Sequence, residues 1–306
     1  MARNRRFLPY RTLETWRIRP YEENTVKTSE YARMAEYEQS YWWHLGRLEI
    51  IRTYMKRAVQ NRSTPIILNV GCGTGGTINM LEEFGKVDNV DASNDAIAFV
   101  KKLGHERIMK VDTISLPFSD KTYDVVGAFD VLEHIEDHLK ALCEWKRILK
   151  DDGAIIITVP AYQWLWSEHD VSLHHQRRYT VRSLMAVAAE AGLKPERKSY
   201  AISFSLPLVV GFRVASRVFG LKSDSETSYV PVPRAINKLF TALLKIEAKM
   251  HNKGTLPTGT SVITILRKSN YSSERGDYSA PAGRPTTQSQ SNGRHPTSSG
   301  PPSSEP

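Results

Sequence analysis

The sequence predicts an α/β fold in which helices pack on both faces of a parallel, doubly wound sheet. Three observations lead to this prediction. Short apolar, β-branched runs alternate with amphipathic stretches between about residues 61 and 203, the order expected for strand–helix–strand units. A glycine-rich loop follows the first run, and acidic residues end later ones. Because the carboxyl ends of parallel strands meet at one edge of a sheet, these loops should surround a ligand there.

The first predicted strand and the loop after it form a cofactor cradle. Residues 66–70 are an apolar run that suits burial on both faces. Gly71, Gly73 and Gly75 follow, and 77–84 has helical character. Glycines allow a sharp turn and a close approach to a ligand, and free N–H groups at a helix start would face it. A glycine turn without a ligand would not explain why strand, glycines, helix and acid coincide.

Two cofactors fit the glycine spacing. Gly71, Gly73 and Gly76 match the G-x-G-x-x-G pattern of dinucleotide-binding folds, in which an acid such as Asp91 follows about 20 residues later. Gly71, Gly73 and Gly75 equally match the G-x-G-x-G loop of enzymes that use S-adenosylmethionine (SAM). A carboxylate at Asp91 can accept hydrogen bonds from both ribose hydroxyls. Spacing alone therefore leaves NAD and SAM open.

The remaining elements continue the alternation. Further strands are predicted near 86–91, 107–111, 123–129, 153–159, 194–204 and 260–266. Helices are predicted near 75–84, 94–103, 136–149 and 180–192. Glu136 and Asp137 suit the N-terminal end of a helix dipole, and Gly192 suits a helix end.

The ordered set of motifs resembles one family over about residues 66–200. The set comprises the glycine loop, the strand ending in Asp91, Val111-Asp112-Thr113, Leu116–Asp120, Tyr123–Ile135 and the strand Ala154–Val159. It closely resembles the class I SAM-dependent methyltransferases, especially small-molecule enzymes with Val-Leu-Glu-His after the fourth strand. The resemblance implies a Rossmann-like, seven-stranded, mostly parallel sheet with an antiparallel last strand, helices on both faces, and SAM as the cofactor.

The resemblance also implies cofactor-binding residues. These are Asn69, Gly71, Cys72, Gly73, Gly75, Asp91, Ala92, Asp112, Thr113 and Asp130. The glycine loop would contact the methionine part of SAM, Asp91 its ribose, and Asp112 with Thr113 its adenine. Asp130 would lie near the transferred methyl group. Asn69 departs from the family, which usually has Asp or Glu there. An amide loses the charge attraction to the ammonium group, which leaves weak SAM binding or an inactive relative as an alternative.

Three histidines are candidate bases that could remove a proton from the methyl acceptor: His134, His169 and His174. His134 also ends Asp130-x-x-Glu133-His134, which resembles the Glu-x-x-Glu-His metal motif of some quinone and small-RNA O-methyltransferases. Metal-free relatives carry Leu-Glu-His at the same place. We therefore predict no metal, and name Asp130, Glu133 and His134 as the ligands of the alternative.

Aromatic and basic residues on both sides of the core are candidate substrate contacts: Trp43, Trp166, Arg177 and Arg178. Arg177 and Arg178 could hold a phosphate or carboxylate. The alternative is structural, with Asp170 and Arg178 paired and Thr180 capping the next helix. A Trp-Trp-x-x-x-Arg helix, His-Asp-x-x-x-His-x-x-Arg-Arg-Tyr-Thr and Gly-Thr-Ser together resemble a bacterial-type group linked with glycan or lipid-linked saccharide pathways.

Four regions are expected along the chain: a basic arm at 1–30, a helical lid at 31–60, a methyltransferase domain at 61–268 and a disordered tail at 269–306. Within the domain, a helical insertion spans about 205–257. It is expected to cap the substrate pocket, or alternatively to present an interfacial surface to a membrane-embedded substrate. The paired tryptophans of the lid serve packing or shape the substrate entrance.

Composition limits the setting. The chain has 306 residues, 40% hydrophobic residues, a net charge of +9 and two cysteines. Few cysteines and no secretory signal favour a reducing, cytoplasmic location, with peripheral contact at the inner membrane surface as an option. The basic arm could attract phosphates, but no RNA-reading module is present, so nucleic acid is not the expected partner. The oligomeric state is left open.

The sequence therefore predicts a SAM-dependent methyltransferase that O-methylates a small-molecule or lipid-linked polar acceptor. Two alternatives remain: a SAM-fold binding protein without transferase activity, and an NAD-dependent oxidoreductase.

Overall fold

The computed structural model describes residues 28–219 and 232–269. The predicted basic arm up to residue 27, the middle of the insertion at 220–231 and the predicted tail from residue 270 lie outside the described residues.

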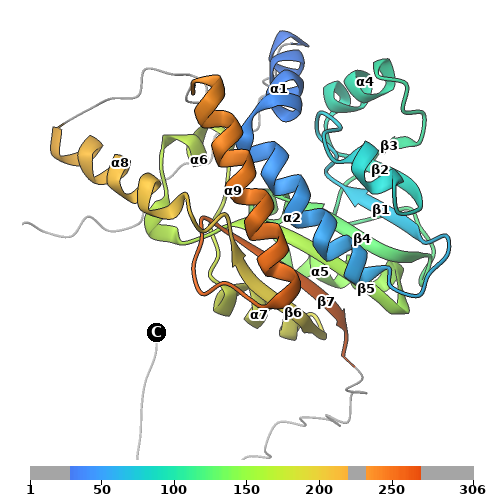
Figure 1. The fold of residues 1–306 in the computed structure, drawn as a ribbon. Helices are drawn as coiled ribbons and strands as arrows, with labels where there is room; N and C mark the ends of the chain where they lie inside the picture. The colour runs from blue at the N-terminus through green and yellow to red at the C-terminus, as the bar shows by residue number, and fades with distance from the viewer. Residues whose placement is uncertain (1–27, 220–231, 270–306) are drawn as a thin grey trace, which may run out of the picture. The chain divides into compact units, whose positions relative to one another are not determined.

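A seven-stranded sheet forms the centre of the described chain (Figure 1). The strand order is β3-β2-β1-β4-β5-β7-β6. The strands are β1 (Ile66–Val70), β2 (Lys86–Asp91), β3 (Ile108–Lys110), β4 (Tyr123–Phe129), β5 (Leu149–Pro160), β6 (Leu193–Ala201) and β7 (Ser261–Lys268). Only β7 runs against its neighbours, since it pairs antiparallel with both β5 and β6. The predicted Rossmann-like fold class is therefore confirmed.

Helices surround the sheet. They are α1 (Thr28–Ser40), α2 (Trp42–Ala58), α3 (Ile78–Glu82), α4 (Asn94–Lys102), α5 (His138–Ile148), α6 (Glu168–Ser172), α7 (Val181–Glu190), α8 (Leu206–Phe219) and α9 (Arg234–Lys253), with short 3-10 turns η1 (Leu132–His134) and η2 (Gln163–Leu165). None of these described helices is long and apolar enough to cross a membrane.

The core has two layers because the central strands are buried on both faces. In β1, Leu68 and Val70 join the hydrophobic cluster that includes α5 and α7, whereas Ile67 joins the cluster that includes α2 and α9. Side chains alternate across a strand, so apolar residues at successive positions fill both layers. The sequence shows this pattern at 66–70, with Asn69 as the one polar residue of the strand.

The inserted helix α9 packs on the N-terminal helix α2, and the two lie side by side over one face of the sheet (Figure 1). Gly46 of α2 makes this close approach possible, because a Cβ atom there would overlap the Leu244 side chain of α9. Trp42 packs on Phe204 and Phe240. The insertion therefore contributes α9 to the sheet layer, and only α8 begins beside the pocket described below.

Several element boundaries differ from the prediction, some of them for local reasons. The helix predicted at 75–84 is shortened to α3, because Gly75 adopts a φ of +88° and the chain turns there before the helix begins. The helix predicted at 136–149 begins at His138, since the Asp137 side chain accepts a hydrogen bond from the Lys140 amide and caps it. Leu149 already pairs with β4.

Candidate active site

A cleft of about 2540 Å³ opens at the carboxyl ends of the central strands. One wall carries the loops after β1, β2 and β3, and the other carries η1 and the segment after β5. Most predicted site residues line it: Gly71, Cys72, Gly73, Asp91, Ala92, Asp112, Thr113, Asp130, His134, His169, His174, Trp43 and Arg178. Asn69, Gly75, Trp166 and Arg177 are not among its lining residues.

The glycine loop bends sharply beside the neighbouring strand. The amides of Gly71 and Cys72 both donate to the carbonyl of Val90. Gly71 has a φ of +66°, and a Cβ atom there would lie 2.5 Å from Val131 Cγ2. Gly73 also has a positive φ, but no atom lies within 4 Å of its Cβ position. The loop thus requires glycine at 71 for packing and leaves free space in front of Gly73.

Asp91 is held in place by two backbone amides at the end of β2. Its Oδ2 accepts from Gly73 N at 2.8 Å, and its Oδ1 accepts from Ser93 N at 2.9 Å. Each carboxylate oxygen can accept a further hydrogen bond. The side chain is therefore oriented in the cleft with acceptor capacity remaining.

Asp112 and Thr113 follow β3 at the outer end of the same wall. Asp112 is exposed, and its Oδ1 accepts from the Ile114 amide at 3.1 Å. The Thr113 carbonyl accepts from Trp145 Nε1 at 3.0 Å, which fixes this turn to α5.

Asp130 connects the sheet to the N-terminal helices. It follows β4 with a φ of +58°, and its Oδ1 accepts from Thr158 Oγ1. Arg47 of α2 lies 2.6 Å from its Oδ2, and the guanidinium sits over the Trp43 ring at 5.2 Å. The pair is mostly buried, with 12% of Arg47 and 24% of Asp130 exposed. Arg47 thereby holds the Trp43 ring at the cleft.

Asn69 does not face the cleft, in contrast to its expected place. The side chain is 1% exposed, and its Nδ2 donates to Asn89 Oδ1 and to Thr77 Oγ1. It joins β1 to β2 beneath the glycine loop. A charged side chain at residue 69 would therefore lie beneath the glycine loop and would not contact a ligand in the cleft.

Glu38 of α1 brings a carboxylate to the loop from the other side. It lines the cleft, and a Cβ atom at Gly76 would overlap its carboxylate. Burial raises the pKa of Glu38, while the charge of Arg47 and the backbone of Gly76 partly oppose the shift.

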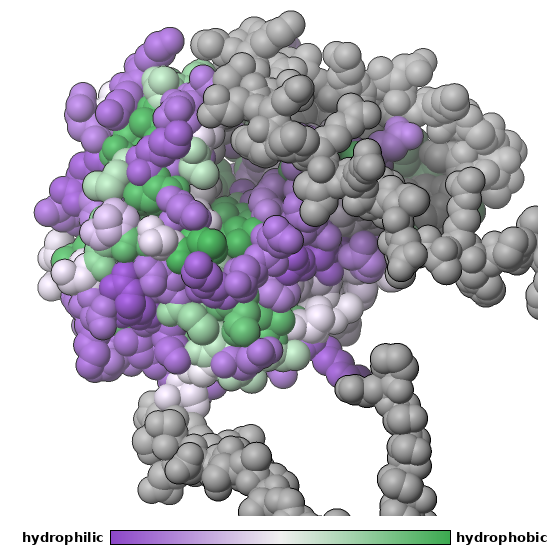
Figure 2. Space-filling view, turned by 180° about the vertical axis from the view of Figure 1, so that it is seen from behind, coloured by the Kyte–Doolittle hydropathy of each residue, from purple (hydrophilic) through white to green (hydrophobic). Residues whose placement is uncertain are grey.

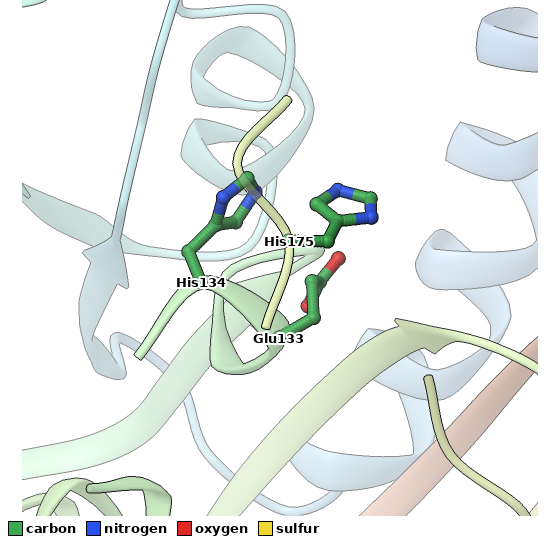
Figure 3. A group of neighbouring side chains, drawn as sticks. All are labelled: Glu133, His134 and His175. Carbon is green, nitrogen blue, oxygen red and sulfur yellow. The ribbon is translucent and has the colours of Figure 1, made fainter. Parts of the chain in front are cut away.

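Glu133, His134 and His175 form a compact cluster in the opposite wall (Figure 3). Burial, reinforced by the charge of Asp130, raises the pKa of Glu133. Desolvation and the adjacent His175 lower the pKa of His134 to about 4. At neutral pH the His134 ring is therefore unprotonated.

The segment after β5 is organised around buried Asp170. Arg178 donates to both of its carboxylate oxygens, at 2.6 and 3.0 Å, and to the Ala161 carbonyl. These contacts hold the pKa of Asp170 well below its usual range, against the opposing effect of burial. Thr180 caps α7. Arg178 therefore has the structural partner that the sequence analysis named as the alternative.

The other predicted residues of this segment lie apart from Asp170. Arg177 donates to the Glu136 carbonyl at 2.8 Å. Trp166 follows η2 outside the cleft lining, whereas His169 and His174 line it.

Sequence reasoning missed three residues of this site: Glu38, Arg47 as the partner of Asp130, and His175. The Trp-Trp-x-x-x-Arg pattern carried a signal for Arg47. The paired histidines at 174 and 175 signalled a functional segment, but not which ring faces Glu133. No local pattern marks Glu38, because its partners are loop residues far along the chain.

Comparisons with known proteins agree with this geometry. Residues 68–157 match the family described as "Methyltransferase domain". A Mycobacterium tuberculosis protein named "Probable S-adenosylmethionine-dependent methyltransferase" is 26% identical over 130 residues, covering 41% of this chain and 47% of that protein. The core of this chain therefore contains a methyltransferase domain over residues 68–157. The Mycobacterium relative is named for SAM, which favours SAM over the NAD alternative.

Other relatives extend the comparison. An uncharacterized Methanocaldococcus jannaschii protein is 36% identical over 100 residues, which are 33% of this chain and 43% of that protein. An uncharacterized methyltransferase of Schizosaccharomyces pombe is 29% identical over 164 residues, 47% of this chain and 58% of that protein. Each of these matches spans less than two thirds of the relative.

Among solved structures, a chain from the complex between the Haloferax volcanii Trm112 methyltransferase activator and a methyltransferase has the same fold. Its TM-score is 0.50 at 17% identity, covering 80% of this chain and 96% of that chain.

Proposed function

We propose that this methyltransferase domain transfers the methyl group of SAM to an oxygen atom of a small or lipid-linked polar acceptor. The observation that carries the proposal is the arrangement of the cleft. Most residues expected to hold SAM line one wall, and several histidines line the facing wall of the same space. A cofactor and an acceptor could therefore meet without a large rearrangement.

The residues of the first wall fit SAM. Gly73 leaves room for a close approach, and Asp91 is preset to accept from ribose hydroxyls. Asp112 and Thr113 would meet the adenine. Asn69 supplies no charge toward the cofactor's ammonium group, but Glu38 brings a carboxylate to the glycine loop. This carboxylate could supply the negative charge that Asn69 lacks, which supports an active enzyme over an inactive relative.

Bound SAM supplies a methyl group on a sulfonium: its carbon–sulfur bond breaks as the carbon–oxygen bond to the acceptor forms. The protein must align the acceptor and take up the proton that the hydroxyl loses. His134, His169 and His174 line the cleft and are the candidate bases. Trp43, fixed by its stacking with Arg47, would exclude water from the same space.

An apolar surface beside the cleft supports a lipid-linked acceptor. Val209 of α8 lines the cleft, and Leu208, Phe212 and Val214 of the same helix are more than half exposed. On the part of the opposite face that is uncovered in Figure 2, hydrophobic residues form small areas separated by hydrophilic ones. An acceptor with a polar head in the cleft and an apolar tail along α8 fits this distribution, and it would bring the protein to the inner surface of a membrane.

The full chain, incubated with methyl-tritiated SAM and cell extract, tests this proposal. We expect label in the organic fraction after phase separation, and mass spectrometry should find a lipid that has gained one methylene unit. Label in a water-soluble product that chromatography separates from unreacted SAM, with none in the organic fraction, would indicate a water-soluble acceptor and overturn the lipid-linked part. Absence of label from every product other than SAM itself, with SAM binding intact in calorimetry, would instead favour a SAM-binding protein without transferase activity.

A further inference from the structure

We propose that Glu133, His134 and His175 form a binding site for a divalent transition-metal ion in the wall of the cleft. Each residue offers one ligand atom, and the three atoms lie within 4.8 Å of one another. The two imidazole rings meet edge to face, with centroids 4.7 Å apart. Ligands about 2.1 Å from one ion lie about 3 to 4 Å apart, so small side-chain rotations would complete the site.

Glu133 gives an independent reason to expect a cation. Its side chain is fully buried, and neither carboxylate oxygen accepts a hydrogen bond from any described residue. Buried polar atoms are nearly always paired, because an unpaired one forfeits its hydration without compensation. Figure 3 shows the Glu133 carboxylate directed toward the His175 ring. A cation between them would satisfy both oxygens.

His175 is held in the orientation that a metal ligand requires. Its Nδ1 lies 2.9 Å from Asp170 Oδ1, and Arg178 holds Asp170 in turn. This leaves the lone pair on Nε2 for an ion, as in the carboxylate–histidine–metal arrangement of known sites. The next residue, Gln176, donates its amide to the Glu133 carbonyl at 2.8 Å and so fixes the loop against η1.

The donor set selects the kind of ion. Two imidazoles and one carboxylate suit Zn²⁺, Fe²⁺, Mn²⁺ or Co²⁺, whereas Mg²⁺ and Ca²⁺ prefer oxygen ligands. The alternative considered from the sequence included Asp130, but Arg47 occupies that carboxylate. His175, about 40 residues further along the chain, takes the third place.

Three protein ligands leave coordination positions open toward the cleft. An acceptor hydroxyl bound there would have a lowered pKa and lose its proton more readily, with His169 or His174 to receive it. This role rests on the proposed methyl transfer, whereas metal binding itself does not.

Titration of the metal-stripped full chain with Co²⁺ alone tests the site directly. We expect one ion per chain, visible ligand-field absorption and a raised unfolding temperature. Glu133→Gln and His175→Ala should each weaken binding at least tenfold. His174→Ala is the matched control, because it removes the adjacent imidazole from the same cleft and should retain binding. Circular dichroism checks that each variant is folded.

The outcomes separate the two proposals. Absence of Co²⁺ binding, or equal binding by Glu133→Gln, would overturn the metal site. Methyl transfer that continues undiminished in a metal-free chain would overturn the metal's role while leaving the proposed function intact. Metal binding without any methyl transfer would support the metal site and overturn the proposed function.

Discussion

The two walls of the cleft differ in how their residues are distributed along the chain. The cofactor wall comes from consecutive β-α units, so Gly71, Gly73 and Asp91 lie within one short stretch of sequence. The facing wall, called here the histidine wall, joins η1 to the segment after β5. Asp130, just before η1, pairs with Arg47 of α2 near the start of the chain. One wall is set by local backbone geometry, and the other by contacts between distant segments.

This difference shows where each kind of chemistry is fixed. Backbone amides orient Asp91, so its geometry follows from the strand and its turn. Asp130 and Asp170 are oriented by the side chains of Arg47 and Arg178. The cofactor wall therefore suits a ligand that many enzymes share, while the histidine wall can vary with the acceptor.

Replacing Asp91 should have the largest effect on SAM binding, because this residue lies at the centre of the cofactor wall. Asp91→Ala removes the expected acceptor for the ribose and the anchor of Gly73. We expect SAM binding to weaken about 100-fold, since two hydrogen bonds to a charged group contribute about 3 kcal/mol. Isothermal calorimetry measures this change.

Asp95→Ala is the matched control, because it removes a carboxylate from the same wall of the cleft and leaves the contacts of Asp91 to Gly73 and Ser93 in place. If both variants bound SAM as the native chain does, the assignment of Asp91 to the ribose would be refuted. The loops after β1 and β2 would then not form the SAM site.

The sheet and the loops of the cofactor wall could be predicted from the sequence for one reason, which is that buried parallel strands have a recognisable apolar pattern. Buried parallel strands need largely apolar runs. The segments 66–70 and 123–129 are such runs apart from Asn69 and Asp124, and they have the bounds that the structure has. Shorter-range effects moved some boundaries. The turn at Gly75 shortened α3, and a change of register lets Leu149 begin β5 early.

The histidine wall could not be predicted from spacing, because its contacts depend on the tertiary fold. His175 rather than His174 belongs to the metal-like cluster, since the backbone bond from Gln176 to Glu133 sets which ring faces inward. The family pattern likewise suggested that Asn69 faces the cofactor, although Asn89 and Thr77 hold it below the loop. A motif gives a residue's place along a strand, but its neighbours decide where it points.

A Glu38→Gln substitution tests whether the distant segments also serve the cofactor. It keeps the shape of the side chain at the glycine loop and removes its charge. We expect SAM binding at neutral pH to weaken about tenfold, the equivalent of about 1.4 kcal/mol for one charge-assisted contact. Tighter binding would show that Glu38 opposes the cofactor, and the two walls would then be separate in function.

Acidity gives a second measurement of the same residue. Burial raises the pKa of Glu38 above its usual 4.5, so as the pH falls this carboxylate loses its charge earlier than an exposed one does. Native SAM binding should weaken in mildly acidic solution, and Glu38→Gln should lose this dependence. Equal pH profiles for the two proteins would contradict the role.

The smallest effect on SAM binding is expected at the position where the family pattern would place the largest. Asn69→Asp restores the family's usual charge, but the new carboxylate would be buried against Asn89 Oδ1, which now accepts from the amide. We expect SAM affinity to stay within about twofold, while the free energy of unfolding falls by about 2 kcal/mol because a donor is lost and a buried charge is gained. Denaturant unfolding and calorimetry separate the two effects, and Asn89→Asp should show the same loss of stability. Clearly tighter SAM binding in Asn69→Asp would mean that a charge at residue 69 in β1 attracts the cofactor through the glycine loop. Residue 69, and not Glu38, would then be the position at which charge favours SAM binding.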